Sequence, residues 1–127
     1  MRAALYQYLT QHCQSITTWR QPYTPTKETP KPYGVIVLGE VIRSPSNREG
    51  SFRDVYIWPY FGGSSYPPLD AAVKEIRGLL DGATLTTSDG MRFTVEFVAE
   101  GRDFRDDDLE AITRRIDFRV PLVGVGL

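Results

Sequence analysis

Apolar and polar residues alternate between residues 53 and 60, with the two-residue period of a β-strand that buries one face. Val55 and Ile57 occupy one side of this predicted strand. The other side is polar and aromatic, and it carries Asp54, Tyr56, Trp58 and Tyr60. Because proline has no N–H to donate, we expect Pro59 at a strand end or on a sheet edge. The strand should stop near Tyr60, before the glycines and serines of residues 62–65.

Apolar residues then recur every three or four positions, which predicts an amphipathic helix. Ser65 or a neighbour is expected to cap this helix, and Pro67 and Pro68 suit its first turn, where an N–H has no partner. The apolar stripe comprises Leu69, Ala72, Val73, Ile76, Leu79 and Leu80. Gly82 suits the left-handed position after the last turn, before residues 83–86 extend again.

The region before residue 53 predicts one more helix and one more strand. A partly apolar face indicates a short helix from about residue 2 to 14. Residues 21–32 hold four prolines and are expected to form an extended arm rather than a paired strand. Residues 33–42 are almost continuously apolar, so we expect a central strand covered on both faces, with Gly39 allowing a bulge. Residues 43–51 are polar and should form a loop.

Two further strands complete the predicted sheet. The turn signal at residues 88–90 pairs residues 83–87 with a strand over residues 91–99. Residues 112–122 alternate as a last strand, whose inner face Arg114 interrupts near its start. We predict an α+β fold in a single domain over residues 1–127. Its mixed or antiparallel sheet of about four to five strands is flanked by the N-terminal helix and the central amphipathic helix.

Composition narrows the classes of function. The 127 residues include 15 basic and 16 acidic side chains, for a formal net charge of -1, so no global electrostatic footprint for nucleic acid or an anionic membrane is present. No apolar stretch has the pattern of a signal peptide or a membrane span. The single cysteine, Cys13, excludes an intrachain disulfide and fits a reducing compartment, so we expect synthesis without export.

Candidate catalytic groups are few. His12 is the only histidine, and it lies beside Cys13, but adjacent helical residues point about 100° apart, so a structural role is favoured. The acidic run of residues 103–110 offers oxygen ligands for a hard cation, but it lacks the spacing and turn glycine of a calcium loop. A solvated loop or a helix N-terminus explains that run better. We predict no cofactor and no metal.

Two other patterns have alternative interpretations. The GGSS sequence of residues 62–65 precedes a helix and could cradle a phosphate, but no Lys-Ser or Lys-Thr follows it, so a turn is favoured. Arg92, Arg115 and Arg119 could line one sheet face and meet nucleic acid. Glu96 and Asp117 alternate with them, which favours a salt-bridged solvent or subunit face.

Four segments match one known pattern in order and spacing: PYGVIVLGEV, VYIWPYF, AAVKEIRGLLDGATL and RRIDFRV. In these segments the chain resembles the tail-terminator, or tail-completion, proteins of long-tailed bacteriophages and prophages. The resemblance covers residues 1 to about 123 and consists of hydrophobic patterns rather than an active-site signature. The chain departs from the family in its long YFGGSSYPP turn and in the proline-rich arm of residues 21–32, which are candidates for partner-specific contacts.

The resemblance implies a structural function with no enzymatic activity. Members of that family assemble as a homohexameric ring on the last ring of the major tail tube protein, stop tube growth, and offer a docking surface to the head–tail connector protein. It implies a minor tail protein of the virion, assembled in the host cytoplasm, whose ring DNA passes through. The alternatives are another head–tail joining or neck protein, or a small metal-dependent enzyme that uses residues 103–110.

A ring of this kind needs two different patches on each subunit, so aromatic residues outside the core are candidates for the interface. The candidate interface residues are Tyr56, Trp58, Tyr60, Phe61, Tyr66, Arg115 and Arg119. A second interpretation is that Tyr56 and Trp58 only cover the other side of the sheet under the N-terminal helix.

Overall fold

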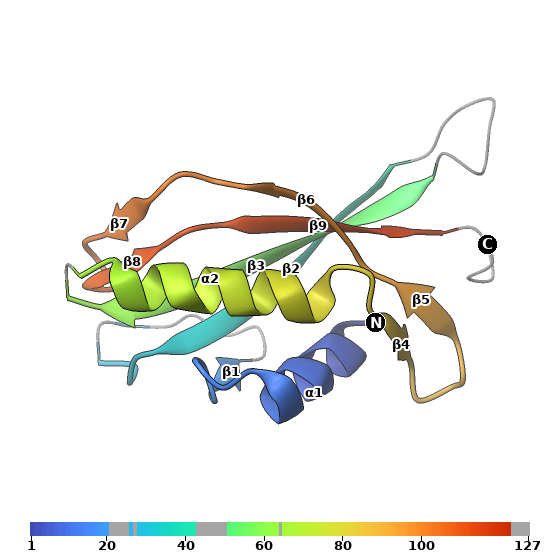
Figure 1. Ribbon diagram of the computed structural model, residues 1–127, viewed down its shortest axis with the longest axis horizontal. Helices are drawn as coiled ribbons and strands as arrows, with labels where there is room; N and C mark the ends of the chain where they lie inside the picture. Colours follow the sequence, from blue (N-terminus) through green and yellow to red (C-terminus); the bar gives the residue numbers. More distant parts are fainter. Residues whose placement is uncertain (21–25, 27, 43–50, 64, 123–127) are drawn as a thin grey trace.

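The computed structural model describes residues 1–20, 26, 28–42, 51–63 and 65–122 (Figure 1). Within these ranges the chain forms two helices and nine strands. In chain order they are α1 (Arg2–His12), β1 (Trp19–Arg20), β2 (Tyr33–Ile42), β3 (Phe52–Gly62), α2 (Pro67–Leu80), β4 (Thr84–Thr86), β5 (Arg92–Thr94), β6 (Glu96–Glu100), β7 (Phe104–Asp106), β8 (Ala111–Thr113) and β9 (Ile116–Pro121).

β3 is the central strand of a seven-stranded sheet. On one side it pairs antiparallel with β2, beyond which β1 lies parallel. On its other side it pairs antiparallel with β9 along its first half and with β8 at its end; β6 and β7 then extend the sheet beyond β9 and β8. β4 and β5 form a separate hairpin. The predicted α+β fold is confirmed, with more strands than the four to five expected.

Both helices pack on the same face of this sheet (Figure 1). The predicted stripe of α2 is buried there, including Leu69 and Ile76, and α1 adds Leu5 and Leu9. The residue before the first turn of α2 is Tyr66, a neighbour of Ser65, but no side chain caps the helix there, so the expected side-chain cap by Ser65 or a neighbour is not formed. At the other end, Gly82 has φ +82° as predicted. The core therefore lies between the helices and one face of the sheet.

Pro59 lies inside β3 rather than at its end or on an edge, and β3 continues to Gly62. β9 pairs with β3 as far as Ile57, and β8 pairs with it from Tyr60. Pro59 falls in the gap between these two partners, where its carbonyl accepts a hydrogen bond of 2.7 Å from the Thr113 hydroxyl. A central strand accommodates this proline because the neighbouring strand is interrupted at the same level.

The expectation that β2 is covered on both faces is wrong. Val37 and Val41 are each 41% exposed, whereas Ile36 is 2% exposed. Helices cover only one face, so a continuous apolar run here leaves some of its side chains outside the core. The bulge predicted at Gly39 is confirmed, since the register with β3 shifts between Leu38 and Val41.

Two predicted strands are each divided in the structure. The strand expected over residues 91–99 bends at Val95, so that β5 pairs with β4 while β6 pairs with β9. The strand expected over residues 112–122 breaks at Arg114, between β8 and β9. β1 and β7 are additional, and the residues around Asp107 form a turn rather than a helix N-terminus. Most of the polar loop at 43–51 and much of the arm at 21–32 lie outside the described residues.

Candidate functional site

The sheet face opposite the helices carries most of the aromatic residues that the sequence singled out. In this face Val35 lies beside Trp58, and Val37 lies beside Tyr56, on β2 and β3. β9 continues the face beyond Tyr56 with Asp117. The open sheet face, as we call it, comprises Val35, Val37, Asp54, Tyr56, Trp58, Tyr60, Asp117 and Arg119. Both described helices lie on the other side of the sheet (Figure 1).

Three rings form a row at one end of the open sheet face. Tyr33 and Tyr60 stack with centroids 5.0 Å apart and an interplanar angle of 17°. The ring of Trp58 follows at 6.5 Å from that of Tyr60, tilted by 21°. Tyr33 is fully buried, whereas Tyr60 and Trp58 are partly exposed. The buried tyrosine supports the two outer rings, so they present a rigid apolar surface at low entropic cost.

Two arginine side chains lie over other rings, those of Tyr56 and Phe52. The guanidinium of Arg115 lies 4.6 Å from the centre of the Tyr56 ring, and its Nε is 2.7 Å from Asp117 Oδ1. Arg119 Nε is 3.0 Å from Glu96 Oε2, and its guanidinium lies 5.5 Å from the Phe52 ring. These ion pairs confirm the prediction of a salt-bridged face, and they do not fit the alternative of a uniformly cationic surface for nucleic acid. Arg92 lies on the separate β4–β5 hairpin.

Tyr56 is held in place from three directions. Its hydroxyl donates to Asp54 Oδ2 at 3.3 Å, and Arg115 covers its ring. Gly39 of β2 backs the ring so closely that a Cβ there would lie 2.9 Å from it. Desolvation and the neighbouring Asp54 carboxylate raise the pKa of Tyr56, so the phenol stays neutral at physiological pH. Tyr56 is therefore a fixed, uncharged contact residue.

Two candidate interface residues do not reach the open sheet face. Phe61 has the strand parity of Val55 and Ile57, points to the core, and is 9% exposed. Tyr66 precedes α2 and packs against the core while partly buried. The choice of both rested on aromatic character alone, and the alternation along β3 was sufficient to exclude Phe61. The same alternation along β2 would have identified Val35 and Val37, which sequence reasoning missed.

The acidic run of residues 103–110 is engaged in local bonds. Asp103 Oδ1 lies 2.6 Å from Arg114 Nη2, and Asp107 Oδ1 lies 2.9 Å from Arg105 Nε. Asp106 accepts the backbone N–H of Leu109 across the β7–β8 turn. Among the residues that the structure describes, no group of three or more His, Cys, Asp or Glu side chains could hold a metal ion. Within the run, Asp106 stabilises the β7–β8 turn, and Asp103 forms an ion pair with Arg114 outside it.

Cys13 and His12 likewise have structural surroundings. Cys13 is buried and donates to Glu75 Oε1 at 3.2 Å, and burial together with this carboxylate raises the pKa of its thiol to about 11. A thiol with that pKa is a poor nucleophile at neutral pH. The His12 ring packs at 4.6 Å from the ring of Tyr8. These surroundings agree with the structural role predicted for both residues.

Glu75 instead joins the first helix to the second. Its carboxylate accepts the backbone N–H groups of Gln14 at 3.0 Å and of Ser15 at 2.9 Å, just after α1 ends. Burial alone would raise the pKa of Glu75, but these hydrogen bonds outweigh it and lower the pKa to about 2. Glu75 is therefore ionised at neutral pH and fixes the segment that follows α1.

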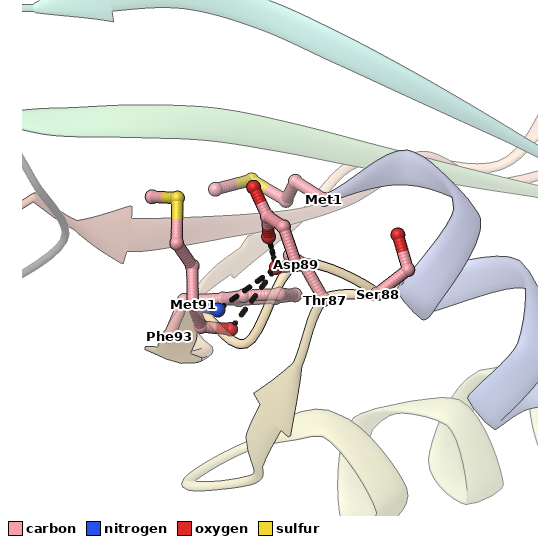
Figure 2. A pocket seen from close by; sticks show the side chains of 6 residues that line it. All are labelled: Met1, Thr87, Ser88, Asp89, Met91 and Phe93. Carbon is pink, nitrogen blue, oxygen red and sulfur yellow. Dashed lines mark hydrogen bonds between the residues drawn. The ribbon is translucent and has the colours of Figure 1, made fainter.

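A hollow of about 280 Å³ lies at the tip of the β4–β5 hairpin, beside the start of α1 (Figure 2). It is lined by Met1, Thr87, Ser88, Asp89, Met91 and Phe93. Asp89 is its only ionisable side chain, and it accepts the Thr87 hydroxyl, which lowers the pKa of Asp89. The hollow thus combines two thioethers, a ring, two hydroxyls and a turn carboxylate that accepts one of those hydroxyls.

Comparison with solved structures finds the same fold in a chain of a gene transfer agent particle. A solved chain from the "Virion of native gene transfer agent (GTA) particle" superposes with a TM-score of 0.74, over 95% of this chain and 92% of that chain. The two sequences are 19% identical, so the likeness establishes the fold. No protein-family model and no curated protein matches the sequence. Among the described helices, none is long and apolar enough to cross a membrane.

Proposed function

We propose that this chain is a structural protein of a phage-like virion, and specifically a tail terminator. It would form a hexameric ring on the end of the tail tube, stop tube elongation, and present the docking surface for the head. The observation that carries the proposal is the near full-length fold shared with a chain of the GTA virion, 95% of one chain and 92% of the other. The ordered motifs in residues 1 to about 123 support the same family.

The open sheet face supports an assembly role rather than catalysis. Its rings and valines are held rigidly, and its charges are paired, for example Arg119 with Glu96 at 3.0 Å. Aromatic anchors in a rigid surface are typical of protein–protein interfaces. Asp103, Asp107, Glu96 and Arg119 are engaged in ion pairs, and Glu75 accepts backbone hydrogen bonds. A non-enzymatic function therefore fits both the surface and the interior.

Purified chain and tube protein test this proposal together. We expect the chain to bind one end of preformed tubes and to stop their further growth in negative-stain images, with six copies per tube end by mass measurement. The double variant Tyr56→Ala with Trp58→Ala should fold but lose tube capping, while Lys74→Ala, on the exposed side of α2, should cap normally. A chain that never associates with tubes or virions would contradict the proposal.

Deletion of the gene separates a terminator from another neck protein. Loss of a terminator yields overlong tails, because growth is no longer stopped. Loss of a different head–tail joining protein yields tails of normal length without heads. We expect overlong tails, measured as the length distribution in virion preparations, and rescue by the wild-type chain. Normal tails without heads would assign the chain to the neck instead.

A further inference from the structure

The exposed large apolar side chains of the described residues gather mainly at two opposite edges of the sheet. Val37 and Val41, each 41% exposed, lie on β2. Val98, 50% exposed, lies on β6, and Phe104, 53% exposed, begins β7. β2 and the β6–β7 pair flank the sheet on opposite sides of β3, with β1 beyond only the first part of β2. One molecule therefore carries two different apolar edges.

On the side away from β3, no described strand pairs with the second half of β2. Gly34 donates its N–H to Thr18 at 2.9 Å, and Ile36 donates to the Tyr6 hydroxyl at 3.2 Å, both away from β3. The same alternation points the N–H and C=O of Leu38 outward. Among the described residues, β1 pairs with β2 only at Gly34 and Val35. An apolar strand edge of this kind is a ready template for pairing with another chain.

The opposite edge is partly covered and partly open. The N–H of Phe97 is already bound by Asp81 at 3.0 Å, so the beginning of β6 is closed. β7 ends its side of the sheet, pairing with β8 alone among the described strands. The open stretch thus runs from Val98 to Phe104, with the exposed Arg102 between its two apolar side chains.

Strand direction and charge make these two edges complementary. β2, β3, β9 and β6 are successively antiparallel, as are β3, β8 and β7, so β2 runs opposite to β6 and β7. Copies related by rotation about an axis along the strands would place β2 antiparallel to the β6–β7 edge of the next copy. Exposed Glu40 lies between Val37 and Val41, and it would face the exposed Arg102 of the neighbour.

We propose that the β2 edge, residues 37–41, joins the β6–β7 edge, residues 98–104, of a second copy of this chain. The contact is head-to-tail, so it repeats around a closed ring and continues the sheet from one subunit to the next. This inference rests on the proposed ring and names the surfaces that would build it. It assigns Tyr56, Trp58 and Tyr60 of the open sheet face to the tube or connector, and it assigns the two edges, Val37 included, to neighbouring subunits.

Cysteine cross-linking tests the pairing directly. Cys13→Ser provides the background, because Cys13 is buried and a serine hydroxyl can also donate to Glu75. In that background we would combine Val37→Cys with Phe104→Cys in one chain, because the register that places Glu40 opposite Arg102 brings these two positions close together, and treat assembled rings with a short bis-maleimide. We expect a ladder of covalent oligomers on a denaturing gel, whereas each single-cysteine chain stays monomeric.

The outcomes separate the inference from the proposed function. Dimers from single-cysteine chains would indicate a two-fold contact between like edges and overturn the head-to-tail pairing. Rings that form on tubes without any ladder would overturn the pairing and leave the terminator function intact. Failure to assemble on tubes in any variant, including the wild-type chain, would overturn the proposed function itself.

A charge exchange provides an independent measurement that does not depend on cross-linker reach. We expect Glu40→Arg or Arg102→Glu alone to weaken ring assembly about tenfold by sedimentation, because each places like charges across the interface. The double exchange should restore assembly to within about threefold of the wild-type chain. Equal losses in the single and double variants would overturn the contact between these two residues.

Discussion

β3 presents two faces that differ in what they contact, although their residues alternate in a single strand. Val55 and Ile57 are fully buried under the helices. Tyr56 and Trp58 lie between and beside them on the open sheet face and remain partly exposed. One face is therefore covered by the chain's own helices, and the other carries no described helix (Figure 1). The same strand can thus carry folding energy on its odd-numbered residues and binding energy on its even-numbered ones.

The same substitution on the helix-covered face and on the open sheet face tests most directly whether the two faces contribute differently to stability. Val55→Ala should lower the free energy of unfolding by about 2–3 kcal/mol, because it opens a cavity in a fully packed core. Val37→Ala removes the same two methyl groups from a residue that is 41% exposed, and it should lower that free energy by less than about 1 kcal/mol. Urea unfolding followed by tryptophan fluorescence measures both. Equal losses would contradict the division between the faces.

Substituting alanine for glycine tests whether the space around the added Cβ determines the change in stability. A Cβ at Gly34 would lie 2.3 Å from the Trp19 ring, whose Nε1 donates to the Ile16 carbonyl at 3.0 Å. Gly34→Ala should therefore lower the free energy of unfolding by about 1–3 kcal/mol, as the ring is forced aside. Gly78→Ala, in α2 with open space around its Cβ, should raise it by up to about 1 kcal/mol. Thermal unfolding of both variants gives opposite shifts if the contacts decide the sign.

Glu75 tests how firmly the helices are held to each other. Its pKa is lowered from 4.5 to about 2, so its stabilising effect is fully present above pH 4.5 and is lost as the pH falls towards 2. Glu75→Gln should lower the free energy of unfolding by about 1–2 kcal/mol at pH 7, since the two N–H groups bind different carboxylate oxygens and an uncharged amide has only one acceptor oxygen.

The difference between the Glu75→Gln and wild-type chains should shrink below pH 4 and continue to fall through pH 2, where the wild-type carboxyl is about half protonated. Urea titrations at several pH values follow this convergence. Glu28→Gln, at an exposed position, provides the control with a small difference throughout. A Glu75→Gln difference that stays constant with pH would show that the carboxylate charge is not the cause.

Local patterns predicted the elements whose environment is uniform along their length. The alternation around Val55 and the stripe of α2 were correct because each strand or helix faces one core throughout. The continuous apolar run of β2 wrongly predicted a strand covered on both faces. The sequence alone does not distinguish an exposed valine such as Val37 from a buried one. Hydrophobicity alone does not distinguish a core from an interface.

Features that depend on the neighbouring strand could not be predicted from the local sequence pattern. Pro59 is compatible with a central strand only because the neighbouring strands β8 and β9 are separated beside it. The residues next to Pro59 in the sequence do not reveal this separation. β7 is three residues long and lies in an acidic run without the pattern of a strand. It is a strand because it pairs with β8. For the candidate site, alternation correctly grouped Tyr56 and Trp58, while aromatic character alone wrongly added Phe61.

The smallest expected effect belongs to the charges of the open sheet face. Arg119 and Glu96 have side chains that are 48% and 43% exposed, so water competes for their ion pair. Arg119→Ala should therefore change the free energy of unfolding by less than about 0.5 kcal/mol, and added salt should abolish the difference. Urea unfolding at low and high salt measures it. A loss above about 1 kcal/mol at both salt concentrations would mean that this face contributes to folding as the helix-covered face does, and the two faces would no longer differ in kind.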